Sequence, residues 1–80
     1  MRGNQLEYKG YTTNIEIDFE AHEFYGEIEG ITDFVNFMSD IDEGVKGIVR
    51  EFHSAVDDYL EFCNAIGKTP SYPLAEVMEA

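Results

Sequence analysis

The stretch VDDYLEFC, residues 56–63, closes a long helical pattern and decides how the rest of the chain is arranged. Its apolar residues recur at steps of three and four, which places them on one face of a helix. These apolar residues are Val56, Tyr59, Leu60 and Cys63. The acidic residues lie off that face: Asp57, Asp58 and Glu61. The stretch therefore predicts a helix that is buried on one side and acidic on the other.

The apolar stripe continues upstream to Ile41 at the same spacing. Ser39 or Asp40 is suited to cap the first turn, because short polar side chains accept hydrogen bonds from its unpaired N–H groups. Gly67 is a typical helix end, and a proline follows it closely. Together these signals predict one helix of about 26 residues over residues 41–66.

Three shorter runs before the helix are predicted to be strands, because apolar and polar side chains alternate in them. They are residues 11–19, 23–29 and 34–38. Gly26 interrupts the second run, which predicts either a bulge or a close approach of the backbone to another part of the chain. In the third run both faces carry large apolar side chains.

The order β-β-β-α predicts an α+β fold, in which one face of a twisted antiparallel sheet is covered by the single helix. We expect the helix to place Phe52 and Tyr59 on the apolar face of that sheet. This face carries Ile15, Ile17 and Ile28. Residues 1–5 are expected to be a frayed start. For residues 71–80 the pattern leaves open an irregular tail, a short extra edge strand or a helical turn.

The size of the chain limits its core. Its 80 residues form one domain, and such a short chain buries only about 60% of the surface that it exposes when unfolded. Cys63 is the only cysteine, which excludes an internal disulfide and leaves no ligand set for a structural zinc ion. We therefore expect the domain to gain stability by assembling into a homodimer or a larger homo-oligomer.

The charge of the chain is strongly acidic: 17 Asp and Glu stand against five Lys and Arg, which gives a net charge of −12. This composition lacks the basic patch that binds phosphates, so we expect no direct binding to nucleic acid and no attraction to an anionic membrane. Charge complementarity favours a basic protein partner instead. Solubility alone is the other explanation of the acidity.

The location of the protein is predicted from three features. The first residues contain no apolar segment of the kind found in secretion signals. No apolar run approaches the length of a membrane span. A lone cysteine on an apolar helix face suits a reducing compartment. Together they predict a cytoplasmic protein.

Three carboxylates are candidates for a Mg²⁺ site of the kind that hydrolyses nucleic acid: Asp18, Glu27 and Asp58. Such a site requires the three side chains to converge. Asp18 is expected on the solvent face of its strand, whereas the helix residues that face the sheet are apolar. We therefore expect no metal ion, no other cofactor and no catalytic site.

The histidines and the cysteine are also candidates for chemistry. His22 falls in a turn, and His53 precedes Asp57 by four residues, a spacing that favours a weak surface pair. Neither histidine has a nucleophile at a suitable spacing, since Ser54 is only a sequence neighbour. Cys63 lies on the buried stripe, where a cysteine packs as a small apolar side chain.

The acidic back of the helix is the stronger indication of function. Asp57 lies four residues before Glu61 and Asp58 lies three before it, and each like-charge pair at these spacings costs the helix a few tenths of a kcal/mol. This unfavourable arrangement favours an intermolecular use. The three residues are therefore candidate partner-binding residues, with a simple solvated face as the alternative.

Several segments, in their order and spacing, resemble the HicB family, the antitoxins of HicAB-type toxin–antitoxin systems. The resemblance covers roughly residues 6–73. The segments are YKGY at residues 8–11, FYGEIEGI at 24–31, VNF at 35–37, and VDDYLEFC with the glycine and proline that follow it.

The resemblance implies a partial, catalytically empty RNase H-like fold that binds a small basic HicA-like toxin and masks its mRNA-cleaving surface. Family members commonly continue into a DNA-binding segment, whereas few residues follow Pro73 here, so we expect no C-terminal DNA-binding domain. Two other functions stay open: a stand-alone oligomeric adaptor without a toxin partner, and a metal-dependent RNase H-like nuclease.

Overall fold

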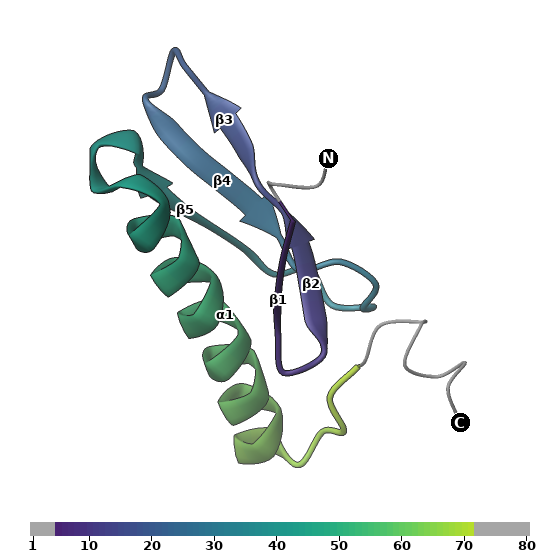
Figure 1. Cartoon of the computed structure of the whole chain (residues 1–80). Coiled ribbons are helices and arrows are strands. Elements are labelled where there is room, and N and C mark those ends of the chain that lie inside the picture. Colours follow the sequence, from purple (N-terminus) through teal and green to yellow (C-terminus); the bar gives the residue numbers. More distant parts are fainter. Residues whose placement is uncertain (1–4, 72–80) are drawn as a thin grey trace.

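One long helix packs against two small antiparallel sheets, one of three strands and one of two, in the computed structural model, which describes residues 5–71 (Figure 1). The predicted α+β class, with strands first and one covering helix, is confirmed. The predicted extra strand at residues 71–80 falls almost entirely outside the described residues. The elements are β1 (Gln5–Tyr8), β2 (Tyr11–Asn14), β3 (Glu16–Asp18), β4 (Glu23–Glu27), β5 (Asn36–Asp40), the 3₁₀ turn η1 (Ile41–Glu43) and α1 (Gly44–Ile66).

The helix begins and ends where its capping signals predict. The Asp40 carboxylate accepts a hydrogen bond of 2.7 Å from the backbone N–H of Asp42, which satisfies one of the unpaired donors of the first turn. Three residues in 3₁₀ form and 23 in α form then follow without a gap. Gly67 ends the helix at φ 73°, a left-handed conformation that favours glycine. The other predicted cap, Ser39, instead points into the protein and is buried.

The predicted strand at residues 11–19 is divided into β2 and β3 at Ile15. Gly26 of β4 lies opposite this break, and a Cβ atom there would lie 2.9 Å from both the Phe37 ring and the Thr13 hydroxyl. The strand register is the same on both sides of the break, so no residue is inserted. Of the two predictions for Gly26, close backbone approach is therefore confirmed and a bulge is excluded.

A strand that sequence reasoning missed precedes these elements. Gln5, placed in the frayed start, begins β1, which pairs antiparallel with β2. The two strands are joined by Lys9 and Gly10, both at positive φ (53° and 86°). Two consecutive positive φ values fit a two-residue hairpin turn whose twist matches that of the strands.

The third strand starts later than predicted. β5 begins at Asn36, and Phe34, expected inside the strand, is 74% exposed. Along β5, Phe37 and Ser39 point toward α1 and are buried, while their neighbours point to the opposite face. The strand order β3-β4-β5 places β5 at one edge of its sheet, and α1 packs mainly on this edge strand.

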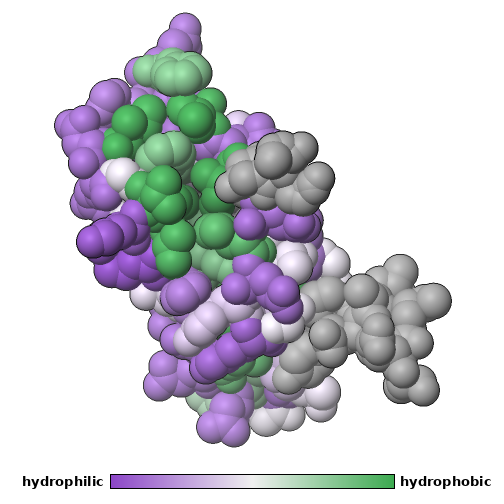
Figure 2. Space-filling model, viewed as in Figure 1, coloured by the Kyte–Doolittle hydropathy of each residue, from purple (hydrophilic) through white to green (hydrophobic). Residues whose placement is uncertain are grey.

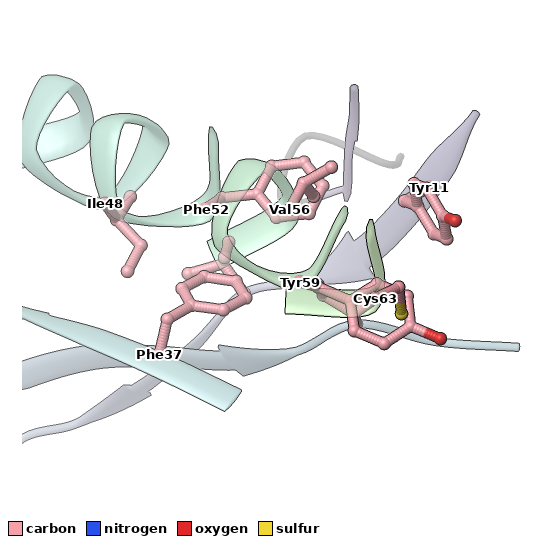
Figure 3. Packing of buried hydrophobic residues seen from close by; sticks show 9 residues of the cluster. Tyr11, Phe37, Ile48, Phe52, Val56, Tyr59 and Cys63 are labelled. Carbon is pink, nitrogen blue, oxygen red and sulfur yellow. The ribbon is translucent and has the colours of Figure 1, made fainter. Parts of the chain in front are cut away.

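The core lies between α1 and the sheet. Phe37 points from β5 toward the helix side chains, and its ring lies 5.4 Å from that of Phe52 (Figure 3). Ile15 and Ile28 are buried against the same cluster, as predicted. The prediction that Ile17 joins them is wrong, because this side chain is 48% exposed. The helix covers β5 more closely than it covers β3, so the far end of the apolar sheet face is left open.

Within residues 5–71, no helix combines the length and the apolar composition that crossing a bilayer requires.

Candidate partner-binding grooves

A groove of about 570 Å³ runs between α1 and the outer edge of β5, and we call it the acidic groove. Its helix side is formed by residues spaced at three and four, which is a single helical stripe. The groove is lined by Val35, Asn36, Phe37, Met38, Glu51, Ser54, Ala55, Asp58, Tyr59 and Phe62.

The acidic groove combines apolar contact surface with negative charge. Phe62, a large apolar side chain of α1, is 56% exposed at its rim. Met38 also borders the groove, but its side chain points to the opposite face of the sheet. Among the described residues, Glu51 and Asp58 are the charged ones that line it, and both are acidic. A surface of this kind suits a partner that offers apolar and basic side chains close together.

Of the three candidate partner-binding residues, Asp58 alone lines the acidic groove, while Asp57 is already engaged within the chain. The Lys9 ammonium donates a hydrogen bond of 2.8 Å to Asp57, and the Tyr8 hydroxyl donates a second of 3.2 Å. The Lys9 contact lowers the pKa of Asp57 and raises the pKa of Lys9. Glu61 is exposed and lies outside the groove lining. The structure therefore separates the three residues into different environments.

A second groove, of about 200 Å³, lies where the helix leaves the sheet uncovered, and we call it the apolar groove. Figure 2 shows hydrophobic side chains gathered on this face, between the upper half of α1 and the β3–β4 hairpin. Ile17, which the prediction placed in the core, forms part of its wall. The groove is lined by Leu6, Ile15, Ile17, Phe24, Val45, Ile48 and Val49.

A polar cluster that the sequence did not reveal lies at the other end of the core. The hydroxyls of Tyr11 and Tyr59 both lie at this end, away from Ile48 (Figure 3). Tyr59 donates a hydrogen bond of 2.6 Å to Asp33, and Lys68 contacts both oxygens of the same carboxylate at 2.6 and 2.7 Å.

The surroundings of this cluster shift the pKa values of both Asp33 and Tyr59. The Lys68 hydrogen bond, followed by that of Tyr59, lowers the pKa of Asp33. Burial, followed by the Asp33 contact, raises the pKa of Tyr59. The backbone N–H of Ser71 also donates to the Tyr59 hydroxyl, at 2.9 Å. These contacts therefore hold the segment after α1 against the core. We call the group formed by Asp33, Tyr59, Lys68 and Ser71 the Asp33 cluster.

The carboxylates considered for a metal site are not brought together. In residues 5–71, three metal-ligating side chains meet only at His22, Asp40 and Asp42, and all three are exposed. His22 lies 3.0 Å from Asp42, and this contact raises the pKa of the imidazole. Because the Asp40 carboxylate already caps the helix, the cluster is explained as an ion pair at the helix start.

The remaining candidates have structural contacts. His53 stacks on the Tyr8 ring with centroids 3.9 Å apart, and the hydrogen-bond partners of Asp57 are Tyr8 and Lys9 rather than His53. Cys63 is a free cysteine and fully buried in the core, as predicted. None of these contacts aligns a nucleophile with a base.

Comparisons with protein-family models, with curated proteins and with solved structures find no match to this chain. The resemblance to the HicB family therefore stays a prediction, and the two grooves are the surfaces on which a partner could bind.

Proposed function

We propose that this chain is a HicB-like antitoxin, or a protein-binding module derived from one, which acts in the cytoplasm. It binds and masks a small basic HicA-like toxin that cleaves mRNA. The observation that carries this proposal is the acidic groove, where exposed Phe62 lies beside Glu51 and Asp58. The net charge of −12 supports it, because an acidic protein attracts a basic partner over long distances.

Binding rather than catalysis is supported by the placement of the carboxylates. Asp18 lies on β3 at a shallow hollow on the other side of the sheet, whereas Asp58 lies in the acidic groove. A metal-dependent hydrolase holds its carboxylates around shared metal ions. The proposal therefore assigns no reaction to this chain.

Co-purification tests the proposal directly. The tagged full chain is expressed in its native host and recovered with its bound proteins at low and at moderate salt. We expect a small basic protein to be retained, and the purified pair to lack the mRNA cleavage that this protein shows alone. Recovery of the chain without any basic protein, or an RNA-cleaving activity that the chain leaves unchanged, would contradict the proposal.

Association kinetics test the contribution of charge. The variant in which Asp57, Asp58 and Glu61 are replaced by Asn or Gln should bind the recovered partner more slowly and with a weaker salt dependence. Dissociation should change less than association. Of these three residues only Asp58 lines the acidic groove, so Asp58→Asn by itself should slow association more than Glu61→Gln does. Equal rates in all variants would place the contact elsewhere.

A stand-alone oligomeric adaptor is the alternative function, and the apolar groove favours it. Ile17 and Val45 expose apolar surface there, and a second copy of the chain is a natural cover for a domain with so small a core. We expect a homodimer or a larger homo-oligomer in either case. Light scattering at micromolar concentrations measures it, with Val45→Glu as the variant that should yield monomer. A 9 kDa species for the unaltered chain would exclude assembly.

A further inference from the structure

The backbone of β5 offers an unused hydrogen-bonding edge beside the acidic groove. Val35 accepts a hydrogen bond from Ile28, and Ile41 donates one to His22, so these two residues direct their backbone groups toward β4. Backbone groups alternate in direction along a strand. The N–H and C=O groups of Asn36 and Met38 therefore point away from β4. Within residues 5–71 no backbone group pairs with this outer edge.

The helix side of the acidic groove matches the spacing of an added strand. Same-face residues of a strand are about 6.7 Å apart, and one turn of a helix rises about 5.4 Å. Successive side chains on one face of a strand beside β5 would therefore meet successive turns of α1. Those turns present Glu51, then Ala55, then Asp58.

We infer that the outer edge of β5 takes up an extended segment of the basic partner as an additional strand. The segment alternates so that its helix-facing residues are basic and apolar in turn. Its Lys or Arg side chains pair with Glu51 and Asp58, and its apolar side chains contact Ala55 and Phe62. Strand addition supplies the affinity through main-chain hydrogen bonds, and the alternating side chains supply the specificity. This inference rests on the proposed function and names the mode of recognition at the same surface.

Nuclear magnetic resonance on the full ¹⁵N-labelled chain tests the inference with two synthetic peptides. The first, the alternating peptide, repeats Lys-Thr-Val-Thr, so that lysine and valine alternate along one face of an extended chain. The second has the same composition with all lysines before all valines. We expect the alternating peptide to bind about fivefold or more tightly than the permuted one, because only it can pair along the edge and fill the groove. The amides of Asn36 and Met38 should then exchange with solvent more slowly.

Two pairs of variants localise the contact. Met38→Pro removes an outward N–H group and should weaken the alternating peptide about fivefold, whereas Met38→Ala keeps that N–H and should bind it well. Glu51→Gln with Asp58→Asn should weaken binding more than the charge-matched pair Glu20→Gln with Glu61→Gln. If Met38→Pro does not fold, strand addition is tested by the exchange rate of the Met38 amide in the unaltered chain.

Each result bears on the inference separately from the proposed function. Equal binding of both peptides with no slowing of the Asn36 and Met38 amides means general charge attraction, and overturns strand addition. Binding of neither peptide overturns it too. In both cases the proposed function is tested separately by co-purification of a basic partner, which does not depend on the mode of contact.

Discussion

The Lys9 ammonium lies 2.8 Å from a carboxylate oxygen of Asp57, which joins the turn between β1 and β2 to the middle of α1. The Tyr8 hydroxyl donates to the other oxygen of the same carboxylate. The contact holds the unpredicted hairpin against the helix and removes Asp57 from the acidic surface that is free for a partner. Asp58, the next residue, remains free in the acidic groove.

Neutralising these two neighbours should have opposite effects on stability. Asp57→Asn loses the Lys9 pairing and should slightly lower the melting temperature, and the loss should shrink as salt is added, because exposed ion pairs are weak and screened. Asp58→Asn only relieves repulsion in a chain of net charge −12 and should raise the melting temperature slightly at low salt. Thermal melts at two salt concentrations measure both. A rise in melting temperature for both variants would show that the Lys9 contact adds nothing to stability.

The core should depend on Phe52, which is fully buried and contacts the Phe37 ring. Phe52→Ala should lower the free energy of unfolding by about 3–5 kcal/mol, enough to unfold most of so small a domain. Phe62→Ala is the matched control, because Phe62 is mostly exposed at the rim of the acidic groove. Urea denaturation followed by circular dichroism compares the two. Similar losses for both variants would mean that the helix is turned differently on the sheet.

Gly26 should not tolerate a side chain. In Gly26→Ala the new methyl group would lie 2.9 Å from the Phe37 ring and the Thr13 hydroxyl, which is too close for either contact. Overpacking of this kind typically lowers the free energy of unfolding by about 1–3 kcal/mol. Phe37→Leu in the same chain should recover part of that loss, since it shortens the obstructing side chain. A Gly26→Ala variant as stable as the unaltered chain would contradict the close approach.

The Asp33 cluster should make the free energy of unfolding depend on pH in the acidic range. Because Lys68 and Tyr59 lower the pKa of Asp33 in the folded state, its contribution is present above the ordinary value of 3.8 and is lost as the pH falls from there through the lowered value. Asp33→Asn should therefore be less stable than the unaltered chain at pH 7, and the difference should narrow toward pH 2. Urea midpoints at both pH values measure this, with Glu20→Gln as the exposed control. An equal difference in urea midpoint at both pH values would mean that the charge of the Asp33 carboxylate does not contribute to stability.

The helix was predictable almost to the residue because its signals are local. The cap at Asp40, the left-handed end at Gly67 and the apolar stripe between them act through neighbours in the chain, and tertiary contacts did not override them. The hairpin at Lys9 and Gly10 has a weaker local signal, since Gly10 suits a positive φ in a two-residue turn but Lys9 is not a residue that favours one. The prediction omits it, because it treats residues 1–5 as a frayed start and places the first strand at Tyr11.

The grooves were not predictable in the same way. Alternation correctly placed Ile15 and Ile17 on one face of the sheet, but it could not show which of them the helix covers. That depends on where α1 lies across the strands. Its packing over β5 buries Phe37 and leaves Ile17 at the wall of the apolar groove.

The chain's own pattern determined that this protein has strands followed by one long helix, which face of that helix packs on the strands, and that its surface is acidic. These properties follow from side-chain spacing and charge, which are present before the chain folds. The position of the helix over the edge strand, the pairing of Lys9 with Asp57 and the joining of Asp33 to Lys68 arose only when distant segments packed together. Each depends on the relative placement of two elements, and spacing along the chain does not specify that placement.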